Sequence, residues 1–326
     1  MPSGGMDATM DTGSDGVRGD LADGVQSRGS RRRRPTPAGD RRAPGRDADY
    51  PENTLRAIDG ALHNGADQIW LTVQLSADGV PVLYRPADLS ALTPASGPVA
   101  SKTAAELVRL NAGWNFRKTL PDGSTEFPYR TSPTPIPTLS DALASVPGAM
   151  PIILDMKALP AAPQVAAVAR VLDEHRAWSR LRLYSTDASY REAWANYPQA
   201  RQFETRDATR ARLLNVALAQ RCEAPLQAGV WAGFEWSRDM TVVETFALGE
   251  ARTPVRANLW TPAAMRCFNA GGSAHVVAFG VNNIDDFHAA ACLGVEGVLV
   301  DSPKAAREWR AQFAVSFDCA AQGALP

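Results

Sequence analysis

Apolar and polar side chains alternate in short runs over most of the chain. Residues 69–75 alternate between the two kinds, which is typical of a strand, and an apolar run follows at 80–85. Asp78 and Gly79 lie between these runs as a hairpin-type turn signal. Ahead of them, helical spacing of apolar residues predicts a helix over 52–64. The first part of the chain is therefore expected to form a helix and then a β-hairpin.

The rest of the chain repeats a strand-then-helix pattern. This alternation predicts parallel β-α units. A count near eight favours a closed (β/α)8 TIM barrel, an α/β fold, over an open doubly wound sheet. Glycine-rich phosphate loops are missing from the sequence, which excludes the common nucleotide-binding folds. Further strands are expected at 152–156, 181–184, 202–204, 230–236, 255–260, 275–280 and 297–301, and helices at 103–110, 139–144, 161–175, 189–197, 208–220, 262–270 and 284–293.

Composition divides the chain into three parts. Residues 1–48 are mostly Gly, Asp, Ser and Arg, so we expect a disordered basic and polar tail that cannot bury enough apolar surface to fold. Residues 49–313 carry the barrel pattern, and 314–326 are expected to be a C-terminal tail. The Arg run at 31–34 is interpreted as part of the solvated tail.

Charge and hydropathy exclude several classes of partner. The net charge of −1 over 326 residues provides no field for nucleic acid. The sequence contains no run approaching the roughly 20 apolar residues needed to span a bilayer. A signal-peptide core is also missing at the N-terminus, so a cytoplasmic location is expected.

The cysteines and histidines give no sign of a metal or disulfide framework. The four cysteines are far apart in sequence and form no C-x-x-C pair, so they are expected to be buried or free thiols. The four histidines show no metal-ligand spacing.

Six short motifs occur in order along residues 43–303. They are P-E-N-T-L at 51–55, G-A-D at 65–67, A-D-G-V-P-V at 77–82, I-P-T-L at 136–139, L-D-M-K at 154–157 and G-V-E-G-V-L-V-D-S-P at 294–303. In order and spacing these motifs resemble the glycerophosphodiester phosphodiesterase family. The resemblance implies a TIM barrel, which agrees with the fold predicted from periodicity.

The resemblance also implies a metal-dependent site. In that family His-Arg-Gly ends the first strand, Glu-x-Asp lies on the second, His-Asp ends the third and Glu-x-Lys lies on the fourth. The acids hold a divalent metal such as Mg²⁺ or Ca²⁺, the two histidines act as general acid and base, and the Lys and Arg bind phosphate.

This chain departs from the family at both histidine positions. Ala43, followed by Pro44 and Gly45, replaces the first histidine, and Arg85 replaces the second. Because a guanidinium stays protonated at any usable pH, Arg85 cannot shuttle a proton. The catalytic residues of this chain are therefore unknown from sequence.

The metal positions are substituted as well. Trp70 and Thr72 occupy the Glu-x-Asp positions, and Asp155 remains as a conservative replacement of the fourth-strand glutamate. Mg²⁺ and Ca²⁺ require several oxygen ligands, so one carboxylate with a threonine hydroxyl is a poor cage. We expect no metal cofactor, with Asp155 as a remnant of the metal site.

The remaining residues predict an anion site. Arg85 and Lys157 are expected to bind phosphate or carboxylate without a metal. Asn282 matches an asparagine that the family often has there and is a further substrate-binding candidate. Trp70 is interpreted either as an apolar wall for a ligand or as a plug in a vacated cavity, and in the second case Arg85 would pair with Asp155.

Three functions are compatible with this pattern. The first is a phosphodiesterase-like protein of lipid and glycerophosphodiester metabolism that binds a small phosphodiester or related anion, with metal-dependent hydrolysis impaired or lost. The second is an active phosphoric diester hydrolase with a relocated acid set from Asp155, Glu204 or Glu235. The third is a non-catalytic binding or regulatory barrel, or a frameshifted gene product.

The sequence before the barrel is a poor first strand. Residues 36–44 read T-P-A-G-D-R-R-A-P, with two prolines and no apolar run. A barrel that lacks a proper first strand has two unpaired edges. Ala-Pro-Gly codons read one base later can encode His-Arg-Gly, so one hypothesis is that residues 1–46 are an out-of-frame or misassigned start.

Overall fold

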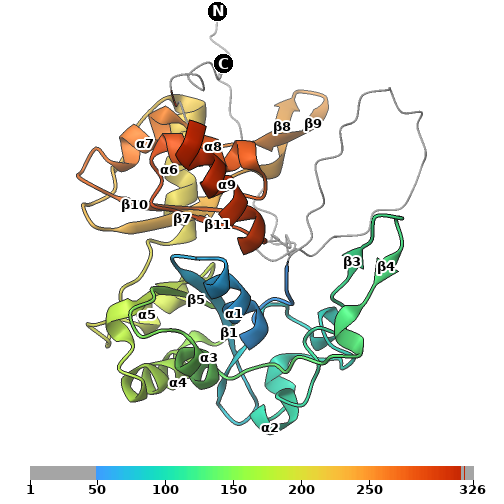
Figure 1. The fold of residues 1–326 in the computed structure, drawn as a ribbon. Coiled ribbons are helices and arrows are strands. Elements are labelled where there is room, and N and C mark those ends of the chain that lie inside the picture. Colours follow the sequence, from blue (N-terminus) through green and yellow to red (C-terminus); the bar gives the residue numbers. More distant parts are fainter. Residues whose placement is uncertain (1–48, 317–318, 320–326) are drawn as a thin grey trace, which may run out of the picture.

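Parallel strands form the centre of the molecule (Figure 1). The computed structural model describes residues 49–316 and residue 319. One sheet runs in the order β2, β1, β5 and β6, in which β2 (Pro81–Leu83) is antiparallel to β1, and a second sheet runs in the order β7, β10 and β11. The strands are β1 (Ile69–Leu75), β5 (Ile152–Met156), β6 (Leu181–Tyr184), β7 (Trp231–Glu235), β10 (His275–Phe279) and β11 (Gly297–Leu299).

Two extended residues connect these groups into a single curved sheet. Gln202 pairs in parallel with Leu183 of β6, and Phe203 pairs in parallel with Trp231 of β7. The strand expected at 202–204 is therefore reduced to two bridging residues. The curved sheet follows the (β/α)8 pattern from β1 round to β11.

Helices pack outside the sheet, and several begin where the sequence provides a capping side chain. Thr54 accepts from the amide of Ala57, and Thr138 forms a reciprocal capping box with Asp141. The α-helices are α1 (Leu55–His63), α2 (Ala104–Leu107), α3 (Leu139–Ser145), α4 (Ala161–Glu174), α5 (Ser189–Ala193), α6 (Arg206–Ala219), α7 (Pro262–Phe268), α8 (Ile284–Leu293) and α9 (Pro303–Ser316), and the 3₁₀ turns are Leu89–Ala91, Val99–Ser101, Pro128–Arg130 and Trp178–Arg180.

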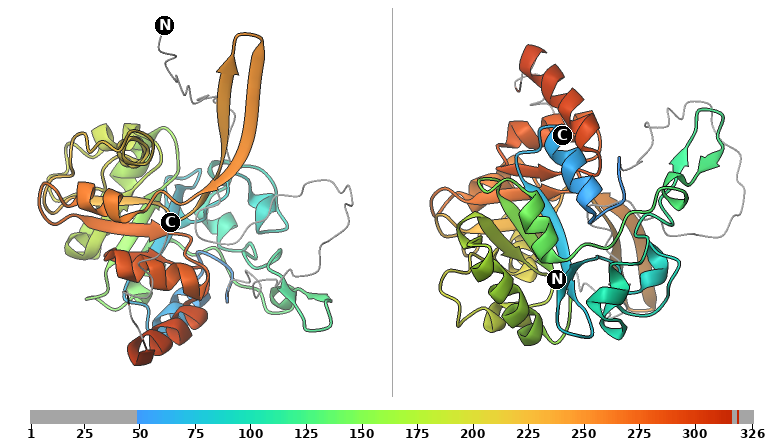
Figure 2. Two further views of the ribbon diagram at one scale, coloured as in Figure 1. Left: turned by 90° about the horizontal axis from the view of Figure 1, so that it is seen from above. Right: turned by 60° about the horizontal axis from the view of Figure 1, so that its bottom comes forward.

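Three antiparallel hairpins extend from this framework. The predicted hairpin is confirmed, because β2 (Pro81–Leu83) pairs antiparallel with β1 after the Asp78–Gly79 turn. A small hairpin of β3 (Lys118–Thr119) and β4 (Thr125–Glu126) lies in the region expected to be a loop. The third, β8 (Arg238–Phe246) with β9 (Gly249–Ala257), projects far from the body in Figure 2.

The prediction of a barrel strand at 255–260 was wrong. Val255 and Arg256 belong to β9 and pair with β8. A central barrel strand must be apolar on both faces, whereas β9 carries Arg252, Pro254 and Arg256. Residues 255–257 thus belong to the projecting hairpin, whereas Leu259 and Trp260 are buried in the apolar cluster that contains β7 and β10 side chains.

Aromatic side chains fill the interior of the curved sheet. A buried cluster there contains Ile153, Tyr184, Phe203, Val277 and Phe279. Two separate apolar clusters lie between the sheet and the helices on each half of the molecule. The interior is thus a packed core rather than a pore, as in TIM barrels generally.

The sheet has a seam between its first and last strands. Within residues 49–316, no ladder of hydrogen bonds connects β11 to β1. This is the place where the sequence predicts an irregular or missing first strand. Residues 1–48, which we expect to be a tail, lie outside the described residues, and α9 continues to Ser316, three residues past the predicted barrel boundary at 313.

Two cysteines form a disulfide that the sequence did not reveal. Cys222 and Cys267 are bonded although 45 positions separate them. Packing of α6 against α7 brings them together, so the expectation of thiols at these positions was wrong.

The described helices are unsuited to crossing a bilayer. From 49 to 316, every helix is too short or too polar to be a membrane span.

Loss of the Cys222–Cys267 disulfide should destabilise the α6–α7 half of the molecule. Because the bond closes a loop of 45 residues, Cys222→Ser is expected to lower the free energy of unfolding by about 2–4 kcal/mol. Denaturant midpoints measure the loss, with Cys319→Ser at an exposed position as the control. Equal midpoints for the two variants would contradict a disulfide in solution.

Candidate functional site

The carboxyl ends of four neighbouring strands place polar side chains in the barrel mouth. Thr72 on β1 lies opposite Asp155 on β5, and Asp155 lies opposite Tyr184 on β6. Glu235 ends β7. Residues two apart on a strand share a face, so Trp70 lies one layer below Thr72, inside the barrel.

Asp155 and Lys157 form an ion pair in this mouth. Lys157 Nζ lies 3.1 Å from Asp155 Oδ2, and Asp155 is 2% exposed. Burial raises the pKa of the Asp155 carboxyl, and the nearby Lys157 and Arg85 charges oppose that shift. Asp155 Oδ1 has no hydrogen-bond partner in the described structure. Asp155 and Lys157 both lie in the barrel mouth. Lys157, which the sequence predicted as an anion-binding residue, already contacts the Asp155 carboxylate.

Arg85 pairs with a glutamate that the sequence analysis did not consider. Its Nη2 lies 3.0 Å from Glu52 Oε2, and its Nε donates to both carboxylate oxygens of Glu52 at 3.1 and 3.3 Å. The alternative in which Arg85 pairs with Asp155 is therefore wrong. Glu52 belongs to the P-E-N-T motif, and this motif was the one signal that could have identified it.

Trp70 is half-buried, packs against aromatic side chains of the barrel interior and also lines a groove of about 380 Å³ beside β1 and β11. Its ring centroid lies 5.2 Å from that of Tyr184 and 4.9 Å from that of Phe279. These edge-on and tilted contacts are typical of an aromatic core. The ring contacts fit the interpretation of Trp70 as a plug, and its place in the groove lining fits the interpretation as an apolar wall.

A second charged cluster lies at the end of β7. Glu235 bonds to Arg206, and Arg238 Nη1 lies 3.3 Å from the same carboxylate oxygen. Burial lowers the pKa of the Arg238 guanidinium and raises that of the Tyr184 phenol, so the phenol stays protonated. In the described part of the chain, Tyr184 Oη and Glu235 Oε2 have no hydrogen-bond partner. The sequence predicted Glu235 as a candidate catalytic acid but did not indicate Arg206 and Arg238 as its partners.

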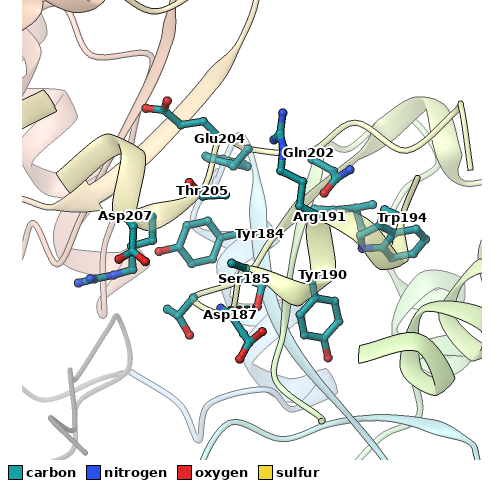
Figure 3. A pocket seen from close by; sticks show the side chains of 15 residues that line it. Tyr184, Ser185, Asp187, Tyr190, Arg191, Trp194, Gln202, Glu204, Thr205 and Asp207 are labelled. Atoms are coloured by element: carbon teal, nitrogen blue, oxygen red, sulfur yellow. Dashed lines mark hydrogen bonds between the residues drawn. The ribbon is translucent and has the colours of Figure 1, made fainter. Parts of the chain in front are cut away.

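Glu204 does not join Glu235 as a carboxylate pair. Glu204 accepts hydrogen bonds from Thr209 and Arg212 of α6. Figure 3 shows its side chain directed away from Tyr184 and Ser185, which line a small pocket beyond β6. A relocated acid set that includes Glu204 is therefore not assembled here.

Asn282 connects the loops after β10 and β11. Its side-chain amide donates to the Asp301 carboxylate at 2.5 Å, and its Oδ1 accepts from the Asp301 amide at 2.9 Å. These bonds give Asn282 a role in positioning the two loops. Ala43, at the first family histidine position, lies outside the described residues.

The side chains of the mouth fit a divalent metal poorly. Each of the three buried carboxylates already contacts a cationic side chain: Glu52 contacts Arg85, Asp155 contacts Lys157, and Glu235 contacts Arg206 and Arg238. A dication would have to displace these partners, and Trp70 supplies no oxygen ligand. Between residues 49 and 316, no group of three or more His, Cys, Asp or Glu side chains is arranged to hold a metal.

Comparison with known proteins gives one family. The model of the "Glycerophosphoryl diester phosphodiesterase family" matches residues 45–305. Protein Rv2277c of Mycobacterium tuberculosis is 48% identical over 262 residues, which cover 80% of this chain and 86% of that protein. Human glycerophosphodiester phosphodiesterase 1 is 34% identical over 96 residues, covering 29% of this chain and 26% of that protein.

Solved structures agree in fold. The crystal structure of the glycerophosphoryl diester phosphodiesterase domain of Rv2277c superposes with a TM-score of 0.74 at 47% identity, covering 81% of this chain and 95% of that one. A glycerophosphodiester phosphodiesterase from Agrobacterium tumefaciens shares the fold with a TM-score of 0.54 at 23% identity, covering 81% and 96%. The chain thus belongs to the glycerophosphoryl diester phosphodiesterase family, as its six motifs predicted.

Proposed function

We propose that this chain is a phosphodiesterase-family barrel that binds a small phosphodiester or related anion and has lost most of its metal-dependent hydrolysis. The observation that supports this proposal most strongly is that Glu52, Asp155 and Glu235 each contact a cationic side chain of the same chain. Family membership supports a glycerophosphodiester as the ligand class. A role in lipid turnover would follow from that ligand class.

The charge balance of the mouth favours an anion. Four basic side chains contact three carboxylates there. Lys157 keeps 24% of its side chain exposed, so its ammonium can reach a ligand in the opening while it contacts Asp155. A phosphate held by such donors gains charge-assisted hydrogen bonds.

Two substitutions explain why hydrolysis would be weak. Arg85 cannot exchange a proton in the usable pH range, and Thr72 cannot supply the charge that a metal ligand supplies. The four histidines also lie elsewhere. His63 is in the last turn of α1 and His288 lies within α8. His175 follows α4 beside Ser140, and His275 begins β10 at the opposite end from the mouth. General acid–base catalysis by histidine therefore has no group in the described part of the mouth.

One observation supports a second candidate, an active hydrolase with a relocated acid. Asp155 Oδ1 and Glu235 Oε2 are buried oxygens without hydrogen-bond partners in the described structure. Burial raises the pKa of the Asp155 carboxyl, which favours its protonated form as a proton donor. Turnover without added metal would favour this alternative.

Anion binding should depend on Lys157. Replacing it in Lys157→Met removes a charged donor while keeping the chain length, so the affinity for glycerophosphocholine and inorganic phosphate should fall about tenfold or more. Isothermal titration measures the affinities. Lys118→Met in the exposed β3 strand is the matched control and should leave binding unchanged. Equal heats for both variants, or no heat from the unmodified protein, would refute the anion site.

The pH dependence of stability should reveal the buried Asp155. Because its pKa is raised in the folded state, the stability that its neutral form contributes is fully present below its ordinary pKa of about 4 and is lost as the pH rises through the folded value. The amide in Asp155→Asn does not titrate, so this decline should disappear in the variant.

Denaturant unfolding of both proteins from about pH 4 to about pH 8 measures the difference between the two curves. The free energy of unfolding of Asp155→Asn, relative to that of the unmodified protein, should increase as the pH rises. A relative decrease would show that the ion pair with Lys157 stabilises the carboxylate by more than its burial destabilises it.

A further inference from the structure

The β8–β9 hairpin projects from the barrel as a sheet of two strands. Figure 2 shows it reaching far beyond the helices, and within residues 49–316 the one strand that pairs with β8 is β9. The residue pairs of the hairpin run from Arg238 with Ala257 at the base to Phe246 with Gly249 at the tip. A hairpin of two strands is at best marginally stable in water, so a further strand beside it would stabilise it.

Apolar side chains of the hairpin are exposed to water. Val242 is 43% exposed, Phe246 60% and Leu248 101%. Side chains two apart on a strand share a face, so Met240, Val242 and Phe246 lie on one face of β8. Val255 of β9, the partner of Met240, adds to that face. Exposed apolar side chains gathered on one face are typical of an interaction surface.

Alternate residues of β8 direct their backbone groups away from β9. In an antiparallel pair of strands, hydrogen-bonded residue pairs alternate with pairs whose N–H and C=O groups point outward. The two-residue turn makes the pair next to it, Phe246 with Gly249, a hydrogen-bonded one. The outward groups of β8 are therefore those of Thr241, Val243 and Thr245. Within residues 49–316, these groups have no hydrogen-bond partner.

The outer edge of β9 is blocked against a further strand, whereas that of β8 is open. Pro254 pairs with Thr241, so it occupies an outward-facing position of β9 and has no N–H to donate there. Arg252 and Arg256 are exposed at the two neighbouring outward positions. Proline and charged side chains are the usual protection of an edge strand. Residues 241–245 of β8 are Thr, Val and one Glu, and β-branched residues favour strands.

The sequence of β8 is complementary to itself in antiparallel order. Two copies paired about Val243 place Glu244 of one opposite Val242 of the other, so no like charges face each other directly. The other opposed side chains are β-branched, aromatic or apolar, which are favourable cross-strand pairs. They are Val243 with Val243, Thr241 with Thr245, and Met240 with Phe246.

Antiparallel pairing of two hairpins also keeps the two barrels apart. The nine residues of β8 span about 30 Å at about 3.4 Å per residue. Because the two hairpins would run in opposite directions, the barrels lie at opposite ends of the shared sheet. The contact therefore requires no complementary surface on the barrels themselves.

We propose that β8 pairs in antiparallel order with β8 of a second copy of this chain, so that two hairpins form one four-stranded sheet. Both molecules use the same edge, which gives a two-fold symmetric contact that closes after two subunits. Both outer edges of the new sheet are β9 edges, and Pro254 on each stops the addition of a third copy. Because one strand from each molecule forms the contact, the dimer is weak, with a dissociation constant in the micromolar range.

Sedimentation of the full chain between about 1 and about 100 μM tests this pairing. The unmodified chain should change from monomer to dimer within this range. Val243→Pro removes an outward N–H from the β8 edge without removing a hydrogen bond between β8 and β9, so this variant should remain monomeric. Arg252→Pro, at the cross-strand partner of Val243, removes an outward N–H from the opposite edge. It is the matched control and should still form the dimer.

Thermal unfolding of the two proline variants confirms that each is folded. A monomeric unmodified chain over the whole concentration range would overturn the proposal. Equal dimerisation of Val243→Pro and Arg252→Pro would also overturn it, because the contact would then not depend on the β8 edge.

Crosslinking tests the position of the two-fold axis at Val243. Opposite Cα atoms in a hydrogen-bonded pair lie about 5.5 Å apart, which a disulfide can span. Cys292→Ser and Cys319→Ser first remove the two thiols outside the disulfide. In that background Val243→Cys should give a covalent dimer on mild oxidation, whereas the control Thr253→Cys, at an exposed position on β9, should not. Crosslinking at both positions, or at neither, would overturn pairing through β8.

Discussion

Neutralisation of buried carboxylates by the chain's own cations is the interaction on which the barrel mouth depends. An ionised carboxylate inside a protein is costly unless a cation or several donors face it. In the phosphodiesterase family a metal ion can serve as that cation, whereas here Lys157, Arg85 and the arginines around Glu235 do so. The mouth is therefore electrostatically complete without a metal, and its excess charge is positive.

The substitutions at the mouth are consistent with one another. Trp70 packs against Tyr184 and Phe279 in the barrel interior. Burial raises the pKa of the Asp155 carboxyl, and the Lys157 charge opposes that shift. An apolar floor with a cationic rim is suited to hold an anion at the opening rather than a dication in the centre.

The sequence predicted the elements well and their long-range partners poorly. Periodicity located β5, α4 and α8 within a residue or two, because local alternation and capping residues determine them. It could not predict the Cys222–Cys267 bond or the contact between Arg85 and Glu52, 33 positions apart, because both arise only from the packing of distant segments. The segment around Arg256 was misassigned because its sequence fits a strand, whereas its partner, β8, is determined by pairing outside the segment.

Calcium-dependent turnover of a glycerophosphodiester tests the central claim most directly. Release of glycerol 3-phosphate from glycerophosphocholine is measured with the full chain in EDTA and in about 1 mM Ca²⁺ or Mg²⁺, a range in which weak oxygen sites are occupied. If the carboxylates are committed to Lys157, Arg85 and the arginines of Glu235, the rate stays at the enzyme-free background in every condition. Saturable metal-stimulated release that disappears in Asp155→Asn would contradict the account.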